Sequence, residues 1–199
     1  MIDFIENIIN TVGYAGIVIM MCLENIFPPI PSEIIMPAAG FATRQGKLTL
    51  PGVILAGTIG AEIGALVMYT IGNRVGEEKA KEWADRHGRW LGVSAKDIEK
   101  GNRWLDKYGL LAVFLGRLTP GLRALISLPA GIAGVNLPGF IIVSTLSAAL
   151  WSSLLAYAGS YLGKNYETVS TYLDPISYLF IGGIIAFFVY RVWRGKGKE

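Results

Sequence analysis

Residues 24–41 read ENIFPPIPSEIIMPAAGF and combine apolar side chains with two glutamates. Closely spaced prolines interrupt the stretch at Pro28, Pro29 and Pro31. A second stretch of this kind, residues 116–131, reads GRLTPGLRALISLPAG and carries two arginines in place of the glutamates. It is interrupted at Pro120 and Pro129. Because proline breaks or kinks a helix interior, neither stretch is an ordinary membrane span.

The rest of the composition is that of an all-α integral membrane protein. Of 199 residues, 52% are hydrophobic and 17% are charged, whereas soluble domains carry roughly a quarter charged residues. Residues 124–163 contain no formal charge. A soluble protein of this size could not bury so much apolar sequence. We therefore predict one membrane domain over residues 1–199.

Several classes of site and partner are excluded at this stage. A single cysteine, Cys22, and a single histidine, His87, exclude an internal disulfide and a Cys-rich or His-rich metal cluster. We predict no metal, no cofactor and no catalytic group. The net charge of +3 comes from Lys and Arg outside the apolar runs. This placement suits anionic lipid headgroups rather than nucleic acid. The oligomeric state is left open.

Uninterrupted apolar segments long enough to cross about 30 Å of hydrocarbon lie at 48–71, 138–162 and 175–193. The interrupted segments differ from these, because broken backbone at membrane depth is stable only where protein or a water-filled cavity covers it. We predict that residues 14–41 and 110–135 form re-entrant helical hairpins.

The chain also contains an internal repeat. When the sequence is aligned with itself at a shift of 87 residues, Leu50-Pro51-Gly52 matches Leu137-Pro138-Gly139, Gly72 matches Gly159 and Gly76 matches Gly163. At a shift of 92 residues, Pro28 matches Pro120, and Pro37-Ala38 matches Pro129-Ala130. Each repeat is a broken hairpin followed by one span. The repeats cover about residues 10–73 and 108–163, with an amphipathic loop at 74–107 between them and a last transmembrane helix at 175–193.

Positive charge predicts the orientation. The loop 74–107 contains nine Lys or Arg and the tail after residue 190 contains four, which places both in the cytoplasm by the positive-inside rule. The two repeats then have opposite topology, the arrangement of inverted-repeat secondary transporters, whose substrate site lies near the membrane midplane.

Five charged residues lie within the apolar segments, namely Glu24, Glu33, Glu62, Arg117 and Arg123. Each would cost about 2.5 to 3.5 kcal/mol near the bilayer centre, so we expect none to face lipid. If the hairpins meet, both hairpin carboxylates come close to both guanidiniums. One interpretation is that buried ion pairs merely hold the hairpins together. The other is a polar cavity where an anion binds the arginines and a carboxylate exchanges a proton.

The second hairpin favours an anion. Thr119 is placed to cap a half-helix that begins at Pro120, and Gly121 allows close approach to the backbone. Free N–H groups and the positive end of the helix dipole would then lie beside the arginines, whose planar forks fit phosphate oxygens. Glu62, on a helix rich in small residues, is assigned either to a proton path or to a helix–helix hydrogen bond.

The two hairpin motifs, with the LPG-started spans and the ending YTIGNRVG, resemble the DedA family of membrane proteins, also described as SNARE-associated or VTT-domain proteins. The resemblance covers about residues 10–190. It implies an inverted-repeat fold, return of undecaprenyl phosphate or another phospholipid across the bacterial cytoplasmic membrane, and proton coupling. It places the family's acidic pair at Glu24 and Glu33 and its arginine pair at Arg117 and Arg123.

The leading hypothesis is therefore a proton-coupled lipid-phosphate flippase that recycles an envelope lipid carrier. A proton-coupled antiporter of a small ion or solute and a phospholipid scramblase are the alternatives. Members of the family are sometimes labelled alkaline-phosphatase-like, but the sequence offers no nucleophile and base pair for a lipid phosphatase. A scaffolding role would leave the five membrane charges without a purpose.

Overall fold

The computed structural model describes residues 8–9, 11–26, 32–91, 95–119 and 122–162. Their regular structure is helical throughout, which confirms the all-α prediction for this part of the chain. The principal helices are α2 (Tyr14–Ile26), α3 (Ser32–Arg44), α4 (Leu50–Leu91), α5 (Ala95–Leu118), α6 (Ser127–Ile132) and α7 (Leu137–Leu162). The predicted helix at 175–193 lies outside the described residues. So do Gly121, which is predicted to approach the phosphate, and four predicted hairpin breaks, namely Pro28, Pro29, Pro31 and Pro120.

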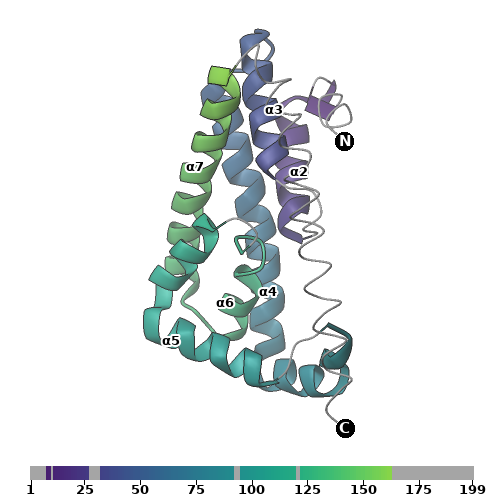
Figure 1. The fold of residues 1–199 in the computed structure, drawn as a ribbon, viewed down its shortest axis with the longest axis vertical. Coiled ribbons are helices and arrows are strands. Elements are labelled where there is room, and N and C mark those ends of the chain that lie inside the picture. The colour runs from purple at the N-terminus through teal and green to yellow at the C-terminus, as the bar shows by residue number, and fades with distance from the viewer. Residues whose placement is uncertain (1–7, 10, 27–31, 92–94, 120–121, 163–199) are drawn as a thin grey trace.

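Two helices have the length and composition of a membrane span: α4 over Leu50–Ala84 and α7 over Leu137–Tyr161. They run along the long axis of the molecule (Figure 1). The span predicted at 138–162 matches α7 closely, but α4 continues well beyond the predicted end at residue 71. The helix is interrupted at Gly76, whose φ of 70° and ψ of 172° are not helical but are accessible to glycine, so two helical runs meet there at a kink.

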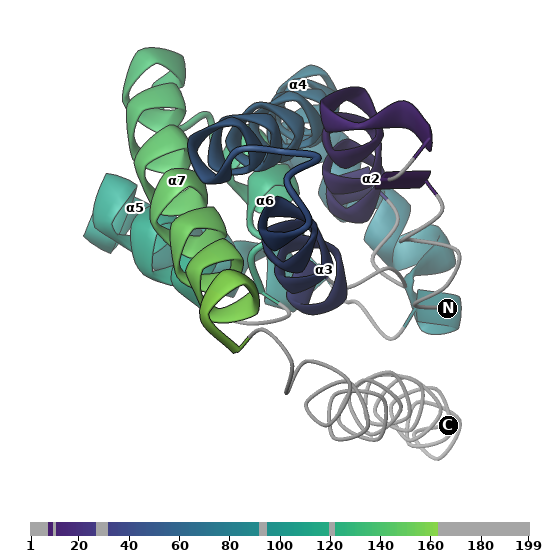
Figure 2. The ribbon, with the colours of Figure 1, turned by 90° about the horizontal axis from the view of Figure 1, so that it is seen from above.

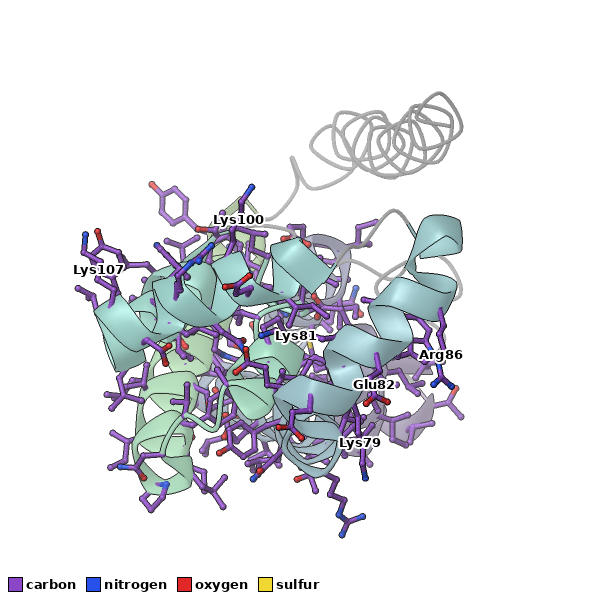
Figure 3. All side chains as sticks on the ribbon, turned by 90° about the horizontal axis from the view of Figure 1, so that it is seen from below. Lys79, Lys81, Glu82, Arg86, Lys100 and Lys107 are labelled. Atoms are coloured by element: carbon purple, nitrogen blue, oxygen red, sulfur yellow. The ribbon has the colours of Figure 1, made fainter. Side chains whose placement is uncertain are left out.

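The segment predicted as an amphipathic loop, 74–107, is helical on both sides of residues 92–94. The end of α4 and the start of α5 lie across the lower end of the molecule (Figure 1). Lys and Arg side chains from both helices spread over this end (Figure 3). Two exposed ion pairs form within the helices, Glu77 with Lys81 and Glu99 with Arg103.

The helices α2 and α3 have 13 residues each, about 20 Å of helix, which is less than the hydrocarbon thickness. The start of α2 is fixed near the start of α4, because the Thr49 amide donates to the Tyr14 hydroxyl at 2.8 Å. The end of α3 is fixed at the end of α7, because Arg44 Nη1 donates to the Ser160 carbonyl at 3.1 Å. Segment 14–44 therefore begins and ends at the same end of the molecule.

The second broken segment lies in the opposite half of the molecule (Figure 1). Leu110 packs against Gly139, at the start of α7. The Tyr69 hydroxyl of α4 donates a hydrogen bond to the Val135 carbonyl. Residues 110–135 thus begin and end near the lower end of α7.

Apolar side chains cover the outside of the helices. On α4 they recur in steps of four residues at Leu55, Ile59, Ile63, Val67 and Ile71, and on α7 at Ile142, Leu146, Leu150 and Leu154. Leu55 is 61% exposed and Leu146 is 60% exposed. An outward apolar stripe that runs for several turns of a helix is suited to lipid rather than water.

Glycines bring the helix backbones together at two crossings. Where α3 meets α7, a Cβ on Gly159 would collide with the Pro37 carbonyl, and one on Gly40 with the Ala156 carbonyl. Where α4 meets α6, a Cβ on Gly72 or Gly131 would collide with the backbone of the facing helix. Seen from above, α4 lies between α2 and α7 (Figure 2). Each crossing therefore joins an arm of one broken segment to the long helix of the other half.

We expect Gly159→Ala to lower the stability of the purified protein by about 1 to 3 kcal/mol, because the added methyl group overpacks a backbone contact. Thermal unfolding in detergent measures the loss, about 2 to 4 °C for each kcal/mol. The matched control is Gly101→Ala in α5, where a Cβ meets no atom within 4 Å. Equal melting temperatures for the two variants would contradict the close crossing.

Candidate functional site

A buried ion pair joins the two broken segments. Arg123 Nη2 lies 2.6 Å from Glu24 Oε2, although the two residues are 99 positions apart in the chain. Glu24 is 5% exposed and Arg123 is 6% exposed. Glu24 is near the end of α2, and Arg123 lies in the turn between α5 and α6. The structure therefore brings together one carboxylate and one guanidinium of the predicted set.

Arg117 is the second buried guanidinium, 4% exposed in the last turn of α5. Its Nη1 donates to the Ser127 hydroxyl at 3.0 Å. Its buried Nε has no hydrogen-bond partner among the described residues. Its charge interacts with those of Arg123, Glu24 and Glu62. Two positive charges thus share this region with Glu24.

A small cavity lies beside the arginines, lined by Ala61, Arg117, Arg123, Ala148, Trp151 and Ser152. The space open to the centre of a water molecule is about 10 Å³. That volume holds about one water. The Trp151 ring lies 5.9 Å from the Arg123 guanidinium carbon, which allows a cation–π contact. The cavity is polar on its arginine side and narrow in this conformation.

Glu62 binds across to α7. The Ser144 Oγ lies 2.6 Å from each oxygen of the Glu62 carboxylate and donates to it. Of the two interpretations of Glu62, the helix–helix hydrogen bond is present in the structure.

Glu33 does not form an ion pair with either arginine. It is half-buried in the first turn of α3, where the Ser32 hydroxyl donates to its Oε2 at 3.3 Å. It forms no ion pair with a described residue, but its charge interacts with that of Glu24. Within the described residues, no group of three His, Cys, Asp or Glu side chains is arranged to hold a metal ion.

The start of the half-helix predicted at Pro120 lies outside the described residues. Residues 122–126 form turns, and the regular helix α6 begins at Ser127 without a side-chain cap. The Thr119 hydroxyl donates back to the Leu115 carbonyl at 2.9 Å, which ties it to the preceding helix. The Thr119 carbonyl accepts the Leu122 and Arg123 amides, so the tight turn, rather than a new helix, places Arg123.

Residues 30–161 match the family model of the VTT domain, which is more than half of the chain. The chain belongs to the VTT domain family. This is the DedA family that the sequence resembles. The protein is accordingly a bacterial membrane protein, with α4 and α7 as its membrane-span candidates in the described residues.

The names of similar proteins include a transporter name and a phosphatase-like name. "Undecaprenyl phosphate transporter A" of Staphylococcus aureus strain NCTC 8325 / PS 47 is 35% identical over 197 residues, 99% of this chain and 97% of the relative. The Bacillus subtilis strain 168 protein of that name is 34% identical over 187 residues, 92% and 90% of the two chains. An "Alkaline phosphatase-like protein" of Lactococcus lactis subsp. lactis strain IL1403 is 39% identical over 176 residues, 88% and 82%. No solved structure matches this chain.

Sequence analysis missed four polar contributors to the VTT domain site. They are Ser127, which binds Arg117, Ser144, which binds Glu62, and the cavity-lining Trp151 and Ser152. A signal was available on α7. Residues 144, 147, 148, 151 and 152 follow a helical i, i+3, i+4, i+7, i+8 spacing, and all five are Ser, Ala or Trp rather than large aliphatic residues.

Removing one partner of the buried ion pair leaves the other charge uncompensated. We expect Arg123→Met to destabilise the VTT domain by about 3 to 5 kcal/mol, and Glu24→Met combined with Arg123→Met to recover most of that loss. Thermal unfolding in detergent measures both. Arg103→Met, which breaks the exposed pair with Glu99, is the control and changes stability by less than about 1 kcal/mol. An Arg123→Met variant as stable as this control would refute the energetic role of the pair.

Proposed function

We propose that this chain carries a lipid phosphate, undecaprenyl phosphate or a related lipid, across the bacterial cytoplasmic membrane, with coupling to protons. The observation that carries the proposal is the pair of buried arginines beside a cavity, with one of them held by a carboxylate that a phosphate could replace. The names of the Staphylococcus aureus and Bacillus subtilis relatives support the same substrate class.

The proposed architecture is an inverted repeat of re-entrant hairpin plus span. Equivalent contacts support it. Gly52 packs against Tyr14, and its repeat mate Gly139 packs against Leu110. Gly72 contacts α6, the second arm of the second hairpin, and its repeat mate Gly159 contacts α3, the second arm of the first hairpin. The cavity-lining Ala61 and Ala148 are also separated by the repeat shift of 87 residues. The site then lies close to the pseudo-symmetry centre.

The proposed orientation places the charged lower end in the cytoplasm. The nine Lys or Arg of residues 74–107 support it through the positive-inside rule. The basic tail after residue 190 is predicted to lie on the same side. The hairpin 14–41 then opens outward and the hairpin 110–135 opens inward, while the polyprenyl tail of the substrate stays in lipid.

Substrate entry requires the helices to separate. A cavity with room for about one water is too small for a phosphate headgroup. The conformation described here is therefore closed around the arginines. Rocking of the hairpins against α4 and α7 would open the site alternately to the two membrane faces. The close glycine crossings support movement of helices as rigid units.

Charge balance supports a proton as the coupling ion. The two arginines and ionised Glu24 sum to one positive charge. A phosphate monoester carries about −1.5 to −2, so its binding beside ionised Glu24 would leave excess negative charge in a site of low dielectric. A proton on Glu24 removes this excess and frees Arg123 for the phosphate. Glu33, whose charge interacts with that of Glu24, is proposed as the second proton carrier. A role of Glu62 in proton coupling and a contact of Thr119 with the phosphate stay predictions.

The proposal is of a transporter rather than an enzyme, although the Lactococcus lactis relative is named alkaline phosphatase-like. The same vesicles distinguish the two activities. A transporter moves labelled undecaprenyl phosphate between leaflets without releasing inorganic phosphate, whereas a phosphatase releases it.

Arg117→Ala and Arg123→Ala are expected to abolish leaflet exchange of undecaprenyl phosphate in liposomes. Arg117→Lys keeps the charge but loses the planar fork, and we expect it to lower the rate by about tenfold or more. Arg103→Lys, on the exposed surface of α5, serves as the control with an unchanged rate. Exchange at the wild-type rate in folded Arg117→Ala and Arg123→Ala proteins would refute the proposal.

Glu24→Gln mimics the protonated carboxyl and releases Arg123. We expect this variant to exchange lipid at a rate that no longer responds to a pH gradient across the liposome, while the wild-type rate responds. Glu99→Gln, which alters an exposed carboxylate of α5, should retain the wild-type response. A normal gradient response in Glu24→Gln would exclude Glu24 as the coupling group.

A further inference from the structure

The wall of the cavity on α7 carries two hydrogen-bond donors that the protein itself does not use. Ser152 is 1% exposed, and its hydroxyl has no hydrogen-bond partner among the described residues. The Trp151 Nε1 atom is also buried and without such a partner in the part of the chain that the structure describes. Both residues line the cavity beside the arginines. Buried polar groups are nearly always paired, so two neighbouring exceptions call for a ligand.

The donor set is suited to an anion. Arg117 adds its own unpartnered Nε to the same cavity, and Arg123 lines it as well. Indole and guanidinium nitrogens donate hydrogen bonds and accept none. Three of the four polar lining residues therefore act as donors alone, and the fourth, Ser152, has a hydroxyl that can donate. A group with several acceptor oxygens and negative charge satisfies all of them.

Ser152 packs against Gly57 of α4, but helix packing does not explain the Trp151 indole. The repeat mates of Trp151 and Ser152 on α4, 87 positions earlier, are Gly64 and Ala65. Gly64 allows α2 to approach, since a Cβ there would lie 2.6 Å from the Cys22 carbonyl oxygen. The equivalent place on α7 holds an indole instead, which faces the cavity and contacts Arg123. The donors are thus a feature of one half of the molecule.

We propose that the Trp151 indole N–H and the Ser152 hydroxyl bind the phosphate group of the substrate, opposite Arg117 and Arg123. This inference rests on the proposed function. The four residues then surround the phosphate from two sides, with charge supplied by the end of α5 and the turn after it, and neutral donors supplied by α7. Neutral donors add geometric selectivity for a tetrahedral oxyanion without adding a third positive charge to the membrane interior.

The experiment compares binding of farnesyl phosphate, farnesol and inorganic phosphate to the full chain in nanodiscs. The test variants are Ser152→Ala and Trp151 replaced by β-(3-benzothienyl)alanine, which keeps the ring shape and removes the N–H. The controls are Ser147→Ala, whose buried hydroxyl is already bonded to carbonyls of its own helix, and Trp104→Phe on α5, which is 42% exposed.

We expect each test variant to bind farnesyl phosphate about tenfold or more weakly, since each loses a hydrogen bond to a charged group. Farnesol binding should not change. The melting temperature without ligand should stay equal or rise for Ser152→Ala, because no hydrogen bond within the protein is lost. This separates a binding role from a structural one. Inorganic phosphate should compete if the headgroup alone is recognised, with the same loss in both variants.

Wild-type affinity for farnesyl phosphate in both test variants would overturn this inference and leave the proposed function intact. Equal losses for farnesyl phosphate and farnesol would also overturn it, because the residues would then act on the tail or on folding. Failure of the wild-type protein to bind either phosphate would overturn the proposed function and this inference together.

Discussion

The rest of the structure depends on the burial of ionised side chains away from lipid. A charge in a hydrocarbon environment is stable only when an opposite charge or a set of hydrogen bonds faces it. Glu24 and Arg123 meet this condition through each other. Their contact fixes the end of α2 against the turn after α5, and so joins two halves of the chain that are distant in sequence. The cavity, the second arginine and the polar face of α7 are arranged around that contact.

Close packing supplies what apolar burial cannot. In a bilayer, helices gain little by burying leucine side chains between them, because lipid tails are equally apolar. Helix association therefore relies on van der Waals contact and interhelical hydrogen bonds. Both are present here. Glycines let backbones touch where α3 crosses α7 and where α4 crosses α6, and Ser144 binds Glu62 between α4 and α7. Large aliphatic side chains occupy both the outer surface and a buried core that includes Ile17, Ile34 and Ile35.

The sequence predicted the two described spans, α4 and α7, because a long apolar run has few alternatives in a membrane protein. It predicted that, if the hairpins meet, Glu24 and Glu33 come close to Arg117 and Arg123, and among the described residues the structure pairs Glu24 with Arg123. The sequence was a poorer guide where alternative local hydrogen bonds and backbone conformations compete. The Thr119 hydroxyl bonds back to Leu115, and a kink at Gly76 joins two helical runs of α4, which continues past the predicted end at residue 71. The sequence could not predict that the donors of Trp151 and Ser152 lack partners, because hydrogen bonding depends on which residues the fold brings next to them.

The crosswise packing has a consequence for how the protein is made. The second arm of the first hairpin, α3, has its main glycine crossing on α7 rather than on a helix of its own half. Arg44 and Ser160, which bond where these helices meet, are 116 residues apart. During synthesis α3 enters the membrane long before α7 leaves the ribosome. The arm α3 is therefore inserted before its main packing partner, and it reaches its native position only after α7 has been inserted.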